Sequence, residues 1–195
     1  MVWRGKRAKS AGGLLFWVAV LYLLVVASAV IYSWVRNIHL FDLSLTVSLY
    51  VALHVWSTVV YFVCAAVICA LLFCYMVKSG ARLVQKIVYG LILLCVFGCA
   101  WFPCNSSRSV LSTDIHNLFA YALVLLMALS FVLLLVLARN RTQRVFALGS
   151  VLYAAVFIGS FVFDFRPFQR TIFLWENVMI ALFFFELYLE KDSRG

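Results

Sequence analysis

The sequence predicts an all-α protein that crosses a membrane six times as one helical bundle. Of its 195 residues, 67% are hydrophobic and only 12% are charged, about half the ~25% usual in soluble domains. The apolar residues gather in six runs of roughly 20 residues, the length that a spanning helix needs. The segments between these runs are too short for a soluble domain. We therefore expect a single transmembrane domain over residues 1–195, and neither a soluble enzyme nor a nucleic-acid-binding protein.

The first three spans are predicted at about residues 13–35, 51–77 and 86–102. A basic run precedes the first span, which contains Ala27-Ser28-Ala29, a pattern that resembles a signal-peptide cleavage site. The apolar stretch continues past this pattern to Val35, so we expect the segment to be retained as a span. The second span is the longest of the three, and the third is the shortest and begins at Lys86.

The last three spans are predicted at about residues 115–138, 145–163 and 171–189. The fourth follows Ser112-Thr113-Asp114, in which Asp114 is expected to be the N-cap that accepts unpaired backbone N–H groups. Small residues in the fifth, including Ala155 and Gly159, are typical of close helix packing in membranes. The sixth carries Glu186 and Glu190 toward its end, and we expect a structural role for Glu186.

The positions of the basic residues predict the orientation. Twelve of the 16 Lys and Arg residues fall on the side of the membrane that carries the N-terminus. Short loops rich in Lys and Arg stay in the cytoplasm, so both termini are predicted to be cytoplasmic. Most of the net charge of +9 is therefore a topology signal, and no nucleic-acid partner is expected.

The predicted outer ends of the second, fourth and sixth spans carry the candidate binding residues. Ionisable groups at membrane depth are costly and usually face a bundle interior or a wet cavity. Each candidate also has a structural explanation as a buried histidine, an interfacial side chain, a helix cap or half of an ion pair. The predicted polar cluster consists of His54, Asp114, His116, Asn117, Arg170 and Glu176.

Three kinds of chemistry fit this cluster. His54 and His116, with carboxylates, are candidate ligands of a catalytic zinc, although no HExxH or HxxxH pair is present. The same two histidines are candidate axial ligands of a haem. The third alternative, recognition of a lipid headgroup by arginine and polar side chains, needs the least special geometry and no cofactor.

One boundary resembles a known group of proteins. Phe102-Pro103, then polar residues, then Asp114-Ile115-His116-Asn117-Leu118-Phe119-Ala120 at the start of a helix looks like the pattern of an uncharacterised bacterial six-helix membrane protein family. That family is similar to the eukaryotic FRAG/DRAM/SFK group. The resemblance implies a six-helix fold and a role linked to lipid handling or stress responses. It points first to His116 and second to Glu176, without established catalytic residues.

The favoured prediction is an integral membrane protein that has a polar pocket facing the outer leaflet and handles a lipid or lipid-like ligand. The alternatives are a metal-dependent intramembrane hydrolase of a lipid amide or ester, and an accessory subunit of a larger membrane complex. Membrane lipid is the expected partner, with a homo-oligomer or a complex partner left open. A bacterial inner membrane, a eukaryotic endomembrane and a plasma membrane all fit the sequence.

Overall fold

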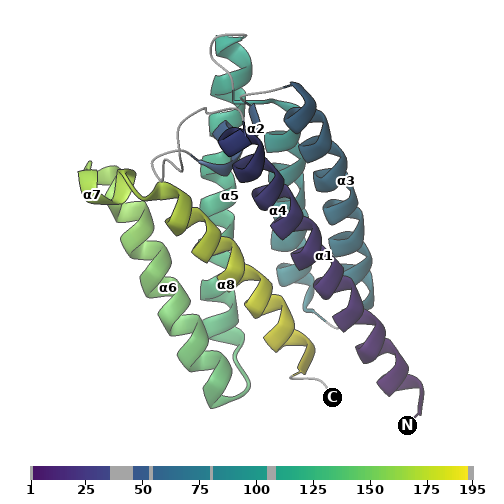
Figure 1. Cartoon of the computed structure of the whole chain (residues 1–195). Coiled ribbons are helices and arrows are strands. Elements are labelled where there is room, and N and C mark those ends of the chain that lie inside the picture. Colours follow the sequence, from purple (N-terminus) through teal and green to yellow (C-terminus); the bar gives the residue numbers. More distant parts are fainter. Residues whose placement is uncertain (1, 36–45, 53–54, 80, 105–108, 193–195) are drawn as a thin grey trace.

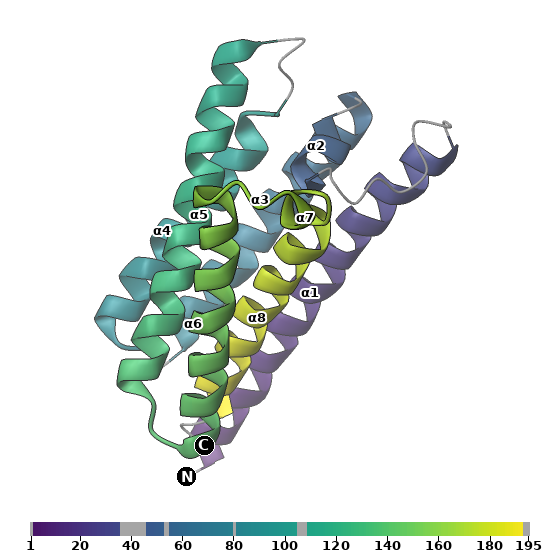
Figure 2. The ribbon, with the colours of Figure 1, turned by 90° about the vertical axis from the view of Figure 1, so that its left-hand side faces the viewer.

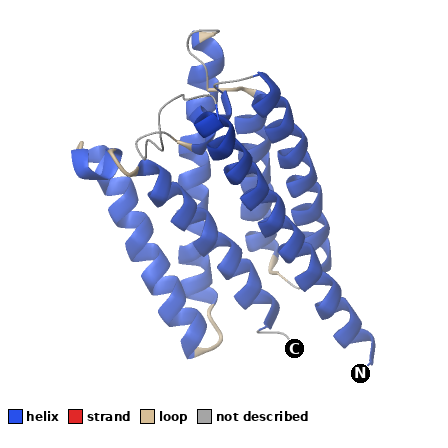
Figure 3. Cartoon of the chain, in the orientation of Figure 1, coloured by secondary structure: helices blue, strands red, loops and turns tan. Residues whose placement is uncertain are grey.

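The computed structural model describes residues 2–35, 46–52, 55–79, 81–104 and 109–192. Among these residues every regular element is an α-helix (Figure 1 and Figure 3). The helices in chain order are α1 (Val2–Val35), α2 (Val47–Ala52), α3 (Val55–Lys78), α4 (Leu83–Trp101), α5 (Val110–Leu137), α6 (Arg141–Val162), α7 (Arg166–Gln169) and α8 (Ile172–Asp192).

Six of the helices are long and apolar enough to cross a membrane, which confirms the predicted number of spans. These segments are Gly12–Ile31, Ser57–Lys78, Leu83–Trp101, Val110–Leu137, Arg141–Val162 and Ile172–Glu190. Large apolar side chains stay exposed along their outer faces, as Leu24, Phe73 and Leu125 show. An apolar surface of this extent is expected where lipid rather than water surrounds the protein. The chain therefore has the architecture of a multi-pass integral membrane protein.

Several helix boundaries differ from the prediction. The fourth span, α5, begins at Val110 rather than near residue 115, because Ser109 supplies an earlier cap. The third, α4, begins at Leu83, before the predicted Lys86. The predicted second span, residues 51–77, coincides with α3 and the end of α2, and residues 53 and 54 lie outside the described part of the chain. Hydrophobic windows locate apolar cores well, but polar residues in a first or last turn hide the true helix ends.

The six long helices pack as a ring, and α8 contacts three of the other long helices. α1 packs on α3, α3 on α4, α4 on α5 and α5 on α6, while α8 contacts α1, α5 and α6. α1 begins and α8 ends at one end of the bundle (Figure 2), which we call the terminal end. The α3–α4 and α5–α6 connections lie there too. The other end, which holds α7 and residues 102–104, is called the distal end. The terminal end corresponds to the predicted cytoplasmic side, and the side that it faces stays a prediction.

The core lies where α8 meets α3, α4 and α5. Phe183 and Leu187 of α8 are buried in one cluster with Tyr75, Ile92 and Phe131. The hydroxyl of Tyr75 donates to the Leu187 carbonyl oxygen at 2.5 Å. The last helix is thus held by side chains from several neighbours, so polar groups on α8 enter the interior of the bundle at both ends.

Candidate functional site

At the distal end, Glu176 joins α8 to α2. The backbone N–H of Val47 donates to Glu176 Oε2 at 3.2 Å, and the Glu176 side chain is half-buried. The next residue, Asn177, accepts a hydrogen bond from the Tyr22 hydroxyl at 2.8 Å. It also donates to the Phe173 carbonyl at 2.7 Å. These two polar residues of α8 therefore hold α1 and α2 at the depth of the second helical turn.

His116 of α5 caps the end of α4. Its Nδ1 lies 3.0 Å from the Cys99 carbonyl oxygen and 2.7 Å from that of Phe102, and the residue is only 2% exposed. Carbonyls in the last turn of a helix have no helical partner. Since both partners can only accept, Nδ1 must carry the hydrogen. In the neutral ring, only Nε2 is then able to bind a metal.

The structure corrects the role predicted for Asp114. Ser109 is the N-cap of α5, and its side chain accepts from the Ser112 backbone N–H at 3.2 Å. Asp114 lies inside the helix with an exposed side chain. The N-cap prediction was wrong because Val110 and Leu111 extend the helix toward its N-terminus, and a Ser at position 109 caps as well as an Asp does.

The described members of the predicted cluster are held by different partners, and a single site formed by all of them stays a prediction. Arg170 is exposed and Asn117 is half-buried. His116 faces carbonyls of α4, whereas Glu176 faces α2, so different partners hold the two leading candidates. His54 lies outside the described residues. The part of the chain that the structure describes holds no group of three or more His, Cys, Asp or Glu side chains able to bind a metal, and the zinc and haem alternatives stay predictions.

Glu176 also acts on the connection between α4 and α5. Burial raises the pKa of the Cys104 thiol, and the negative charge of Glu176 raises it further. Cys104 is half-buried beyond the end of α4. Glu176 of α8 therefore influences the charge state of a thiol that follows the end of α4.

At the terminal end, two glutamines hold the end of α8 from opposite sides. Each lies in the first turn of a helix and accepts a backbone N–H of the preceding connection: Gln85 from Arg82 at 3.0 Å and Gln143 from Arg139 at 2.9 Å. Their Nε2 groups point to α8, where Gln85 donates to Glu190 Oε1. Gln143 donates to the Leu189 carbonyl at 3.2 Å. Both glutamines are buried, so α4 and α6 begin with the same device.

Two glutamate side chains of α8 extend the polar contacts of these glutamines deeper into the bundle. The Tyr89 hydroxyl lies 3.1 Å from Glu186 Oε1 and 3.0 Å from Glu190 Oε2. The Ser130 hydroxyl donates to Glu186 Oε2 at 2.8 Å. Glu186 is fully buried, and its partners come from α4 and α5. These contacts agree with the structural role that we expected for Glu186.

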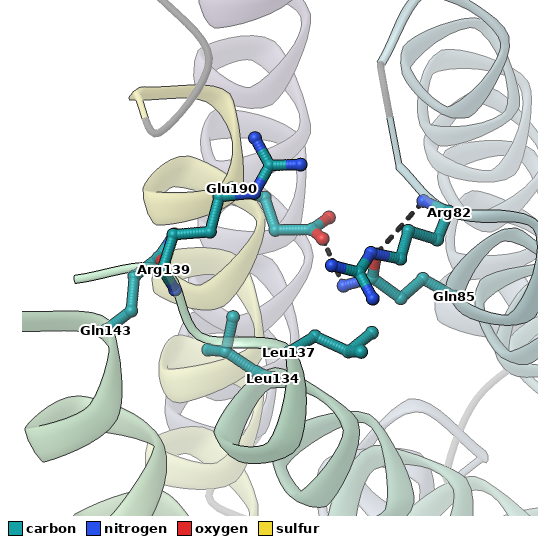
Figure 4. A pocket seen from close by; sticks show the side chains of 7 residues that line it. All are labelled: Arg82, Gln85, Leu134, Leu137, Arg139, Gln143 and Glu190. Atoms are coloured by element: carbon teal, nitrogen blue, oxygen red, sulfur yellow. Dashed lines mark hydrogen bonds between the residues drawn. The ribbon is translucent and has the colours of Figure 1, made fainter.

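A pocket opens beside this group at the terminal end (Figure 4). Its cavity has a volume of about 20 Å³, and the wider space of about 260 Å³ around it includes open solvent. Arg82 and Arg139 are exposed, while Glu190 is 7% exposed. The basic groups are thus accessible from outside, and the carboxylate belongs to the buried wall. The pocket is lined by Arg82, Gln85, Leu134, Leu137, Arg139, Gln143 and Glu190.

The prediction from sequence missed this pocket. A signal was present, because Arg82 and Arg139 each precede an apolar helix whose first turn carries a glutamine, and Gln at N3 is part of a capping box. The distances along the chain to Glu190 gave no reason to combine the three segments. The basic residues were interpreted as a topology signal and as patches that attract anionic lipid head groups, without a pocket.

Comparison with protein families, with curated proteins and with solved structures gave no match for this chain. The resemblance to the six-helix family stays a prediction based on its motif residues.

Proposed function

We propose that this integral membrane protein binds a lipid or lipid-like ligand, and that the pocket at the terminal end receives a phosphate-bearing headgroup. The observation that carries the proposal is the combination of two exposed arginines with a pocket whose wall contains buried polar side chains. Arginine binds phosphate through charge-assisted, often bidentate, hydrogen bonds. Basic pockets between spanning helices on the cytoplasmic side are known as headgroup sites.

The depth of the pocket supports the same ligand. Its lining residues come from the first or last turns of spanning segments, since α4 begins at Leu83, α5 ends at Leu137 and the last span ends at Glu190. Helix ends of this kind lie at the border between hydrocarbon and headgroups. A lipid whose acyl chains lie along the apolar outer faces would bring its phosphate to this level.

The distal end is the second candidate location, as the sequence predicted for a pocket facing the outer leaflet. It is favoured by Glu176, a half-buried carboxylate inside a spanning segment, because such groups mark functional sites in membrane proteins. Arg166 and Arg170 are exposed at the same end. The two locations share the proposed ligand class and differ in the residues that bind it.

Native mass spectrometry of protein released from mild detergent tests the proposal. We compare the wild type with Arg82→Gln/Arg139→Gln at the terminal end and with Arg166→Gln/Arg170→Gln at the distal end. Both double variants remove two exposed arginines. With about 1 kcal/mol for each basic residue near a membrane surface, the terminal variant should lose lipid adducts roughly 30-fold, while the distal variant keeps them.

Two other results would change the conclusion. Loss of adducts only in the distal variant would assign the ligand to the outer leaflet. A wild type that carries no phospholipid even after reconstitution with it would refute lipid binding.

A further inference from the structure

Inside the terminal end, one tyrosine hydroxyl lies between two glutamate side chains. The oxygen of Tyr89 is 3.1 Å from Glu186 Oε1 and 3.0 Å from Glu190 Oε2. A phenolic hydroxyl carries one hydrogen, and an ionised carboxylate can only accept. Tyr89 therefore donates to one glutamate, and the second contact needs a hydrogen from the other carboxyl group. The distances fit three groups that together hold two hydrogens, one on Tyr89 and one on a glutamate.

The surroundings assign the additional proton to Glu186. Its side chain is fully buried within the last span. Its partners among the described residues are the hydroxyls of Ser130 and Tyr89, and neither partner carries a positive charge. An isolated ionised carboxylate is so costly in an apolar interior that the group becomes neutral instead. Oε2 of the neutral acid accepts from Ser130, and Oε1 carries the proton that faces Tyr89.

Glu190 has different surroundings, one helical turn closer to the terminal end. It lines the same pocket as Arg82 and Arg139, and Figure 4 shows the Arg82 side chain and the Glu190 carboxylate pointing toward one another. Positive charges nearby stabilise an ionised carboxylate. Glu190 is therefore the acceptor of the Tyr89 hydrogen, while Gln85 donates to its other oxygen. The two glutamates differ in charge because only one of them reaches the pocket.

The other helices around this part of α8 present neutral side chains to it. Tyr75 of α3 and Gln143 of α6 donate to backbone carbonyls of α8. Val18 of α1 belongs to the surrounding apolar cluster. In the part of the chain that the structure describes, the proton on Glu186 is thus in hydrogen-bond contact with one titratable group, Tyr89.

We infer that Glu186 is a proton-binding site inside the membrane, connected to the terminal end by Tyr89 and Glu190. The proton of Glu186 Oε1 moves to the Tyr89 oxygen while the Tyr89 hydrogen moves to Glu190 Oε2. Two O–H bonds break and two form, so the net result is one proton carried from the interior to the wall of the pocket, and the reverse transfer reloads the site. The ligand of this site is a proton, so the inference goes beyond the proposed lipid binding and does not depend on it.

Infrared spectroscopy detects the proton directly, because the C=O stretch of a neutral carboxyl group is separate from the bands of a carboxylate. The protein is measured at neutral pH in a maltoside detergent, which has no carbonyl group of its own. The wild type should show a neutral-carboxyl band that Glu186→Gln loses. Glu176→Gln is the matched control, since it removes the same residue type from the same helix outside this group, and it should keep the band.

A second substitution guards the assignment against a folding defect. Glu186→Gln should fold, because its amide can donate to Tyr89 and accept from Ser130 as the neutral acid does. Glu186→Asp retains a carboxyl group, so the band should move in frequency rather than disappear. An identical neutral-carboxyl band in the wild type and in Glu186→Gln, or an unmoved band in Glu186→Asp, would overturn the inference.

The route through Tyr89 is tested by the rate at which the Glu186 proton exchanges for a deuteron after transfer to D₂O. Tyr89→Phe removes the bridging hydroxyl and should slow the exchange by about tenfold, the rate ratio for about 1.4 kcal/mol in barrier height. Tyr75→Phe is the matched control, because this buried tyrosine also bonds α8 but donates to the Leu187 carbonyl. Equal exchange rates in the two variants would refute the connection through Tyr89.

Discussion

Gly98 allows α4 and α5 to approach each other at the distal end, and an alanine at this position should destabilise the fold. A Cβ atom there would lie 2.6 Å from Cγ and Cδ2 of Phe119 and 2.7 Å from its Cδ1. The ring stacks on Phe102 with centroids 6.1 Å apart and an interplanar angle of 12°, so moving it to make room for a Cβ atom would disturb this contact as well. Overpacking of this kind costs about 1–3 kcal/mol.

Gly90 provides a control on the same helix. No heavy atom lies within 4 Å of a Cβ added at Gly90, so Gly90→Ala should gain roughly 0.5–1 kcal/mol from the helix preference of alanine. The same helix gain applies at Gly98, so the two alanine variants should differ in free energy of unfolding by the overpacking cost alone, about 1–3 kcal/mol. The gap arises from the surroundings of the two glycines, since the chemical change is identical.

Reversible unfolding in mixed micelles with increasing dodecyl sulfate, followed by circular dichroism, measures this gap. Gly98→Ala should unfold at a lower denaturant fraction than the wild type, and adding Phe119→Leu should recover part of the loss. Equal stability of Gly98→Ala and Gly90→Ala would show that α4 and α5 do not approach at Gly98. It would also remove the basis for the neighbouring contact between His116 and the end of α4.

Two further predictions concern the two ends of the bundle. Gln143→Ala should lower the free energy of unfolding by about 1–2 kcal/mol, because two buried hydrogen bonds are lost, while Thr142→Ala at the exposed neighbouring position should change it by less than about 0.5 kcal/mol. The same micelle titration measures both variants. Equal free energies of unfolding would contradict a stabilising contact between Gln143 and α8. In a variant whose only cysteine is Cys104, a water-soluble maleimide should react slowly at neutral pH, since burial and Glu176 raise the thiol pKa. Glu176→Gln lowers that pKa, raises the thiolate fraction and should speed labelling; an unchanged rate would place Glu176 too far from Cys104.

Helix number followed from the sequence because span length is a property of consecutive residues. A run of about 20 apolar residues must form a helix in a bilayer, where backbone groups find no water. The helix ends were harder to predict, because several polar residues near each end compete for the capping role. Ser109 and Asp114 are both good caps, and only the packed structure shows that Ser109 holds the position.

Individual polar side chains were harder to place than the spans. His116 was singled out as a group near membrane depth, and its partners are the carbonyls of Cys99 and Phe102 at the end of α4. Glu176 was expected to face a pocket, to pair with Arg170 or to interact with its own helix N-terminus, and the structure shows it accepting a hydrogen bond from the Val47 backbone N–H. In both cases the partner is a backbone atom, which no side-chain pattern in the sequence marks.

The sequence alone determined the class of protein, the number of spans and the sorting of charge between the two ends, because each depends on local composition. The tertiary structure decided which way each helix is rotated about its axis. That rotation brings Gln85, Gln143 and Glu190 together, although more than 40 residues of chain separate each from the next. A turn of 100° about any one helix would direct its side chain into lipid instead. The terminal pocket is therefore a product of packing, and its lining includes two arginines that the sequence analysis used to predict the topology.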